Sequence, residues 1–150
     1  MASKRDGQPW MPAPAYGRSL AGLGVNLLVR DIARSVAWQQ AVLGASLVYG
    51  DADFAVLRFP GGGAPAEWML HADHTYGDHP LLGLTGDGAL RGAGVELRLH
   101  GCDPDRAAAA AAARGDPVLA PPADKPHGLR EAYLVDPDGY VWVPDVPLPA

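Results

Sequence analysis

The sequence predicts an α+β fold built from two copies of one β-α-β-β-β module. In each half, a strand-like run is followed by a helix and then by three further strand-like runs. Asp31 and Asp103 are placed to open the two helices, and Gly44 and Gly115 are placed to end them. The opening residues are 72 positions apart and the closing residues 71. This near-constant shift favours an internal repeat over an unrepeated α+β chain.

In the first half, LGVNLLVR (23–30) alternates as a strand does, and IARSVAWQQAVL (32–43) places its apolar residues near helical spacing. The three strand-like runs that follow are SLVYG, FAVLRF and EWMLHA, separated by glycine-rich turns. We expect the first module to contain one helix and four strands.

The second half repeats this order, with VELRLH as its first strand and DRAAAAAAAR as its helix. Asp103 and Pro104 suit the N-cap and first helical position. Alanine is the best helix former and is small enough to lie flat on a sheet, so the alanine run predicts a packed helix. The remaining strands are expected in PVLAPP, REAYLV and GYVWV.

The repeat divides the chain into an arm, two modules and a connecting loop. The prolines of the arm favour an extended conformation over a helix or a central strand. Trp10 and Tyr16 are the aromatic residues of this arm, and a second subunit or the mouth of a pocket would cover them. The expected boundaries are 1–21 for the arm, 22–72 and 93–146 for the modules, and 73–92 for the loop.

Composition excludes several classes of protein. The formal net charge of −5 and the pI near 5.4 provide no basic field, so we expect no nucleic-acid partner. The sequence holds no signal-peptide-like apolar segment and no run long enough to span a membrane. The single cysteine, Cys102, cannot form an intramolecular disulfide and lacks an evident partner for nucleophilic catalysis. We expect a cytoplasmic protein with no membrane partner.

Two segments, RDIARSVAWQQAVLGA and DKPHGLREAYLVDPDGYVW, resemble the vicinal oxygen chelate superfamily. This superfamily includes glyoxalase I, extradiol dioxygenases, fosfomycin-resistance proteins and bleomycin-resistance proteins. The resemblance covers about residues 22–146. It implies that each module curls into half a barrel, that the mixed sheets enclose a cavity, and that enzymes of the family hold a divalent metal there.

The resemblance also identifies four metal-ligand positions, which are occupied here by Gly24, Met69, Glu96 and Val143. Glycine and valine have no donor atom, and a methionine sulfur is a poor ligand for Mg²⁺, Mn²⁺ or Zn²⁺. Only Glu96 retains a ligand side chain. We therefore expect no metal and no other cofactor.

Strand alternation predicts the face that lines the cavity, since residues two apart share a side. Glu96, His71 and Glu131 are the candidates for accepting or shuttling protons. Arg98 is expected to bind an anionic group, and His127 occupies a loop that the family uses as a rim. Alternatively, Glu96 and Arg98 form ordinary ion pairs on a solvated sheet face. The candidate ligand-binding residues are Asn26, Met69, Arg98, His100, His127 and Tyr133.

Two functions stay open on these residues. The first is metal-independent binding or sequestration of a small or medium organic ligand, similar to bleomycin-resistance-type proteins, by a homodimer. The second is a lyase, isomerase or dioxygenase whose divalent ion (Fe, Mn, Ni or Zn) is held by His71, Glu96 and Glu131. Whether the chain is an enzyme is left undecided by the sequence.

Overall fold

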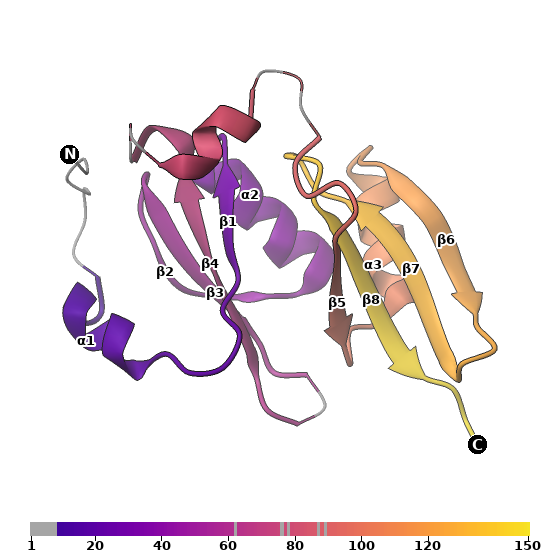
Figure 1. The fold of residues 1–150 in the computed structure, drawn as a ribbon. Helices are drawn as coiled ribbons and strands as arrows, with labels where there is room; N and C mark the ends of the chain where they lie inside the picture. Colours follow the sequence, from indigo (N-terminus) through magenta and orange to yellow (C-terminus); the bar gives the residue numbers. More distant parts are fainter. Residues whose placement is uncertain (1–8, 62, 76, 78, 87, 89) are drawn as a thin grey trace.

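Eight strands form two four-stranded mixed sheets, one from each half of the chain (Figure 1). This computed structural model describes residues 9–61, 63–75, 77, 79–86, 88 and 90–150. The strand orders are β1-β4-β3-β2 in the first sheet and β5-β8-β7-β6 in the second. In both sheets the first strand of the module pairs in parallel with the last, and the other pairs are antiparallel. The predicted duplicated α+β fold is confirmed.

The first module, whose sheet we call sheet A, follows the local signals of its sequence closely. Asp31 caps the helix, where its Oδ1 accepts a 2.9 Å hydrogen bond from the Arg34 amide. Gly44 ends the helix with φ +73°, a left-handed conformation that glycine adopts without steric cost. The elements are β1 (Asn26–Val29), α2 (Ile32–Trp38), a π-helical turn (Gln39–Leu43), β2 (Ser46–Gly50), β3 (Phe54–Phe59) and β4 (Ala66–Ala72).

The second module, with sheet B, repeats this arrangement. Asp103 accepts hydrogen bonds from the amides of Asp105 and Arg106 and so caps the alanine-rich helix. Ala107 and Ala111 are fully buried, and their small side chains let the helix pack closely on the sheet. The elements are β5 (Glu96–His100), α3 (Pro104–Ala113), β6 (Val118–Asp124), β7 (Leu129–Val135) and β8 (Val141–Pro147).

One hydrophobic core joins both modules on the helical side of the sheets. Helices α2 and α3, the π-helical turn and alternate residues of the strands supply most of this core. Trp68 of β4 and Trp142 of β8 meet within it, with ring centroids 5.1 Å apart. The opposite sides of the sheets are therefore available for a site.

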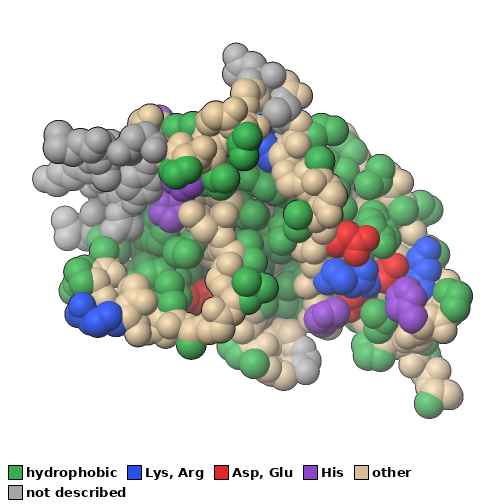
Figure 2. All heavy atoms as spheres, in the orientation of Figure 1, with side chains coloured by type: hydrophobic (Ala, Val, Ile, Leu, Met, Phe, Trp, Pro, Cys, Tyr) green, Lys and Arg blue, Asp and Glu red, His purple; other side chains and the backbone are tan. Residues whose placement is uncertain are grey.

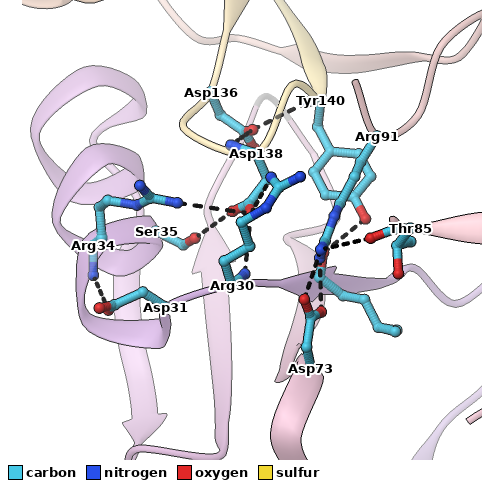
Figure 3. A network of polar contacts seen from close by, with 11 residues as sticks. Arg30, Asp31, Arg34, Ser35, Asp73, Thr85, Arg91, Asp136, Asp138 and Tyr140 are labelled. Carbon is cyan, nitrogen blue, oxygen red and sulfur yellow. Dashed lines mark hydrogen bonds and ion pairs between the residues drawn. The ribbon is translucent and has the colours of Figure 1, made fainter. Parts of the chain in front are cut away.

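The turn between β7 and β8 fastens the second module to the first (Figure 3). The buried Asp138 carboxylate accepts hydrogen bonds from the Arg30 amide at 3.0 Å and from the Ser35 hydroxyl at 3.1 Å. It also pairs with the Arg30 guanidinium at 3.2 Å. The Tyr140 hydroxyl donates to the carbonyl oxygen of Leu28 at 2.8 Å. These contacts fix the start of α2 and the end of β1 against the second half of the chain.

The segment between the modules contains two short 3-10 helices, Asp73–Thr75 and Pro80–Leu84. Arg91 follows them and is only 4% exposed, yet its guanidinium is well paired. It makes two hydrogen bonds to the Asp73 carboxylate, at 2.7 and 2.6 Å, and one to the Leu28 carbonyl. Because both this guanidinium and Tyr140 bind Leu28, the segment is held against the same end of β1 (Figure 3).

The arm differs from its expected extended conformation, because α1 (Ala13–Ser19) is a helix. Pro12 is its N-cap and Pro14 lies in its first turn, where a helix needs no amide donor, so these prolines do not oppose it. Residues 1–8 of the predicted arm lie outside the described residues. Within the described part of the chain, no helix is long and apolar enough to cross a membrane.

Candidate functional site

A cavity of about 900 Å³ lies between the two modules, where core residues such as Trp68 and Trp142 and residues of the opposite sides of the sheets both line it. Residues 22–25 before β1 and the start of β4 form one wall, and β5 forms the facing wall. Residues of the arm, including Tyr16 and Leu20, close part of its rim. The charged side chains that line it are Arg58, Glu67, Glu96 and Arg98.

The cavity includes three of the four positions that the family resemblance assigns to metal ligands. Gly24, Met69 and Glu96 line it, while Val143 is fully buried on β8, paired in register with Arg98. A glycine, a thioether and an aliphatic side chain do not provide the oxygen and nitrogen donors that hard divalent ions require. The donor set at these positions therefore does not fit the metal of the family's enzymes.

A charged cluster lies on the side of sheet B that faces away from α3, where the register of the strands brings its residues together. His100 of β5 and Glu131 of β7 both lie directly opposite Asp145 of β8, on its two sides. Glu131 and Asp145 are 3% and 1% exposed, so two carboxylates face each other in a buried position. Two adjacent like charges destabilise a sheet unless a cation lies between them.

Arg98 supplies that cation. Its Nη2 contacts Glu131 and lies 3.2 Å from Asp145, and its Nη1 donates to Glu96 at 3.0 Å. The hydrogen bonds to Glu131 and Glu96 raise the pKa of Arg98 although burial alone would lower it. Burial alone would raise the pKa of Glu131, but hydrogen bonds from Arg98 and His127 hold that pKa below its ordinary value of 4.5. Arg98 and Glu131 are thus both ionised at neutral pH.

Two histidines and a tyrosine complete this cluster at its solvent edge. His100 Nδ1 lies 2.8 Å from Asp145, and His127 Nε2 lies 3.3 Å from Glu131. Both imidazoles are more than half exposed. The Tyr133 hydroxyl lies 3.5 Å from Glu131, and its pKa is raised by hydrogen bonding to Glu96. Figure 2 shows acidic, basic and histidine side chains gathered over the second module.

The expected role of Arg98 in binding an anion stays a prediction, and its surroundings weigh against it. Three carboxylates already contact the guanidinium, so its charge is more than neutralised. The alternative of ion pairing on the sheet face describes these contacts well. Apart from its two histidines, the cluster contains three carboxylates and one guanidinium.

The corresponding side of sheet A is aromatic. Phe54 of β3 lies 4.8 Å from the His71 ring, 6.3 Å from Tyr49 and 6.5 Å from Tyr16 of the arm, measured between ring centroids. Trp10 contacts Tyr16 at 5.0 Å and Tyr49 at 5.6 Å. The arm thus covers sheet A within the same chain, and Trp10 remains 40% exposed.

Polar groups connect the arm to sheet A and to the cavity. The Tyr16 hydroxyl donates to Glu67 at 3.0 Å, and Arg58 pairs with the same carboxylate at 2.7 Å. Burial, and then the bond to Glu67, raise the pKa of Tyr16 to about 12. Farther along the sheet, His71 Nδ1 lies 2.5 Å from the Asn26 side-chain oxygen.

The structure distributes the predicted site residues over two groups. Asn26, Met69 and His71 lie on sheet A, and the other candidates lie in the charged cluster of sheet B. His71 is therefore on a different sheet from Glu96 and Glu131. Among the described residues, no three histidine, cysteine, aspartate or glutamate side chains are grouped so that they could hold a metal ion.

Sequence reasoning missed Asp145, which is central to the charged cluster. The available signal was alternation, because Asp145 lies two positions after Val143 and shares its side of β8. Cys102 lies away from this site. It is buried, its thiol donates to the Leu43 carbonyl at 3.4 Å, and burial raises its pKa to about 11, all of which oppose nucleophilic reactivity.

Comparison with known families agrees with this architecture. The model of the Glyoxalase/Bleomycin resistance protein/Dioxygenase superfamily matches residues 23–143. The chain therefore belongs to this superfamily. No curated protein matches the sequence.

Solved structures show the same fold at low sequence identity. TioX from Micromonospora sp. ML1 is 24% identical, with a TM-score of 0.58, over 87% of this chain and 98% of its own. A glyoxalase/bleomycin resistance protein/dioxygenase family enzyme from Burkholderia phytofirmans PsJN is 20% identical, with a TM-score of 0.64, over 83% and 96%. A glyoxalase/bleomycin resistance protein/dioxygenase from Nocardioides is 25% identical, with a TM-score of 0.51, over 90% and 92%. These likenesses establish the architecture and leave the activity to the site.

Proposed function

We propose that this chain binds a small or medium organic ligand in the cavity between its modules, without a metal ion, and sequesters it. The observation that carries this proposal is the set of residues at the family's metal positions. Gly24, Met69 and Val143 offer no suitable donor, and the Glu96 carboxylate is engaged by Arg98. A cavity of about 900 Å³ is of the size that encloses such ligands.

We further propose that the ligand carries a positive charge. Glu96, Glu131 and Asp145 together outnumber the single guanidinium of Arg98 in the charged cluster. The two other charged residues of the cavity wall, Arg58 and Glu67, neutralise each other. The field in the cavity therefore favours a cationic group near Glu96, whose side chain is 45% exposed.

A pair of matched, non-aromatic probes tests the charge preference. Cyclohexylamine and cyclohexanecarboxylate differ in charge but not in ring size, and their binding at pH 7.5 can be followed by NMR titration of the protein amides. One favourable charge contact near the surface is worth about 1 kcal/mol, so we expect the amine to bind about fivefold more tightly. Glu96→Gln should remove that advantage. Asp116→Asn, which removes a carboxylate from the surface pair with Arg114, is the matched control.

The competing function is a divalent-metal-dependent lyase, isomerase or dioxygenase, and the retained Glu96 is the feature that favours it. Elemental mass spectrometry after exposure to Mn²⁺, Fe²⁺, Ni²⁺ and Zn²⁺ and desalting separates the two functions. Near-stoichiometric retention of one ion, lost in Glu96→Gln, would overturn the proposal. Tighter binding of the carboxylate probe would overturn its charge assignment. Homodimer formation is a further expectation, which light scattering tests.

A further inference from the structure

A second, smaller recess of about 240 Å³ lies between the arm and sheet A. It adjoins the larger cavity, because Tyr16, Leu20 and Met69 line both. Its chemistry is different, since no aspartate, glutamate, lysine or arginine is found among its described lining residues. The two spaces therefore favour different kinds of chemical group.

Aromatic rings and thioethers form the walls of this recess. Trp10 and Tyr16 meet at an interplanar angle of 67°, and Phe54 and His71 meet at 55°. Edge-on and tilted geometries are the favoured arrangements of aromatic pairs, and a ligand ring could adopt the same geometry against Trp10 or Tyr16. Met11 and Met69 also line the recess, and methionine sulfur makes favourable contacts with aromatic edges. Trp10 remains 40% exposed, so its ring is only partly covered by the protein.

The recess is open because of the residues that α1 presents to it. Ala13, Tyr16 and Gly17 line it at the i, i+3 and i+4 positions of one helical face, and Leu20, directly after the helix, lines it too. Two of these four are small, and a Cβ added at Gly17 would meet no atom within 4 Å. The helix is meanwhile held on the sheet by the contacts of Tyr16 with Glu67 and Phe54. Ala13 and Gly17 are both exposed, and α1 buries none of its residues. An anchored helix with small residues beside the recess leaves room that the described residues do not fill.

We propose that this recess is a binding site for a planar aromatic group of one or two fused rings. An apolar protein cavity of about 150 Å³ holds one benzene ring, so 240 Å³ is adequate for a bicyclic ring. Trp10, Tyr16 and Phe54 supply ring contacts, and the absence of charge from the described lining favours a neutral group. The site does not depend on what occupies the larger cavity, although the shared wall lets one molecule extend into both.

Fluorine NMR with 5-fluoroindole tests the recess directly. We expect the probe to bind with a submillimolar Kd, and Gly17→Leu to weaken this binding at least tenfold by filling the space. Ala15→Leu is the matched control, because Ala15 lies on the same helix but does not line the recess, so the added side chain should leave the Kd unchanged. Trp10→Ala, which removes a partly exposed ring rather than a core residue, should weaken binding about fivefold, in the range of one aromatic contact.

The outcomes separate this proposal from the function proposed above. Glu96→Gln changes only the larger cavity and should leave the Kd of 5-fluoroindole unchanged. Failure of the unmodified protein to bind 5 mM probe would overturn the aromatic site, and so would equal binding by Gly17→Leu. Displacement of the probe by cyclohexanol as readily as by indole would overturn the requirement for a planar ring. None of these results depends on whether cyclohexylamine binds.

Discussion

Each of the two sheets packs one side against a helix. The residues on the other side find their partners differently in the two sheets. Sheet B completes its own side, because Glu96, Asp145 and Glu131 on three adjacent strands share Arg98, so that each carboxylate of the cluster has a partner. Sheet A depends on a segment outside the repeat, since the arm supplies the rings that cover Phe54. The two modules of the repeat are therefore alike on the sides that pack against the helices, and they differ in the side chains on their other sides.

This difference has an energetic meaning. The contacts on sheet B involve buried charges, so removing one partner leaves the remaining charges buried without compensation. The contacts on sheet A are largely apolar, so removing one ring subtracts an area of contact without leaving a charge uncompensated. The following changes test that asymmetry in order of expected size.

Arg98→Leu should have the largest effect. It leaves the buried carboxylates of Glu131 and Asp145 facing each other without a cation, which costs about 3–5 kcal/mol of unfolding free energy at pH 7.5. Urea unfolding followed by tryptophan fluorescence measures the change. Arg58→Leu on sheet A is the matched control, and it should cost less than about 1 kcal/mol because the Arg58–Glu67 pair is half exposed.

The pH dependence of Arg98→Leu should have the opposite sign to that of the unmodified protein. The pKa of Glu131 is below 4.5 in the folded protein, so its stabilising contribution is complete above pH 4.5 and is lost as the pH falls through the folded pKa. Without Arg98, burial raises this pKa, and stability should increase as the pH falls from 7 towards 5. A variant that is equally destabilised at pH 5 and pH 7.5 would contradict the account of buried carboxylates.

Deletion of residues 1–20 should have an intermediate effect. It removes Trp10 and Tyr16 from sheet A and exposes Phe54, with an expected loss of about 2 kcal/mol for the apolar area involved. Urea unfolding again measures the change, and light scattering detects any association through the uncovered side. A shorter deletion of residues 1–8, which keeps both rings, separates their effect from that of shortening the chain. An unchanged midpoint after the longer deletion would show that the arm does not stabilise sheet A.

Tyr16→Phe should have the smallest effect, because it retains the ring and removes one hydrogen bond to Glu67. The expected cost is about 1 kcal/mol. Ultraviolet titration should lose one phenol that ionises near pH 12, since burial and the bond to Glu67 hold the pKa of Tyr16 there. If the phenol that is lost ionises near its ordinary pKa of 10.0 instead, the Tyr16 hydroxyl is not held by burial and by Glu67.

The fold was predictable because its signals are local. Asp31 and Gly44 specify the limits of a helix from their own side chains and backbone preferences, and they do so again at Asp103 and Gly115. The arm was predicted less well, because a proline opposes a helix only beyond its first turn. The π-helical turn at Gln39–Leu43 carried no sequence signal that alternation or capping reveals.

The candidate site was predictable only in part, because it depends on contacts between strands distant in the sequence. Alternation places Glu96 and Arg98 on one side of β5, and the structure agrees that they interact. It cannot show that Asp145 lies opposite both His100 and Glu131, because this follows from the register of β8 with its two neighbours. Nor could it show which sheet the arm covers.

The fastening of the modules by Asp138 and Tyr140 has a kinetic consequence. Their hydrogen bonds to Ser35 and Leu28 connect residues 103 and 112 positions apart in the chain. Closing so long a loop costs conformational entropy before any of these bonds can form, and proteins rich in such distant contacts fold slowly. During synthesis, Arg30 and Ser35 emerge more than a hundred residues before the carboxylate that they bind. The Arg30 amide and the Ser35 hydroxyl therefore gain this partner only after the last turn of the second module has formed.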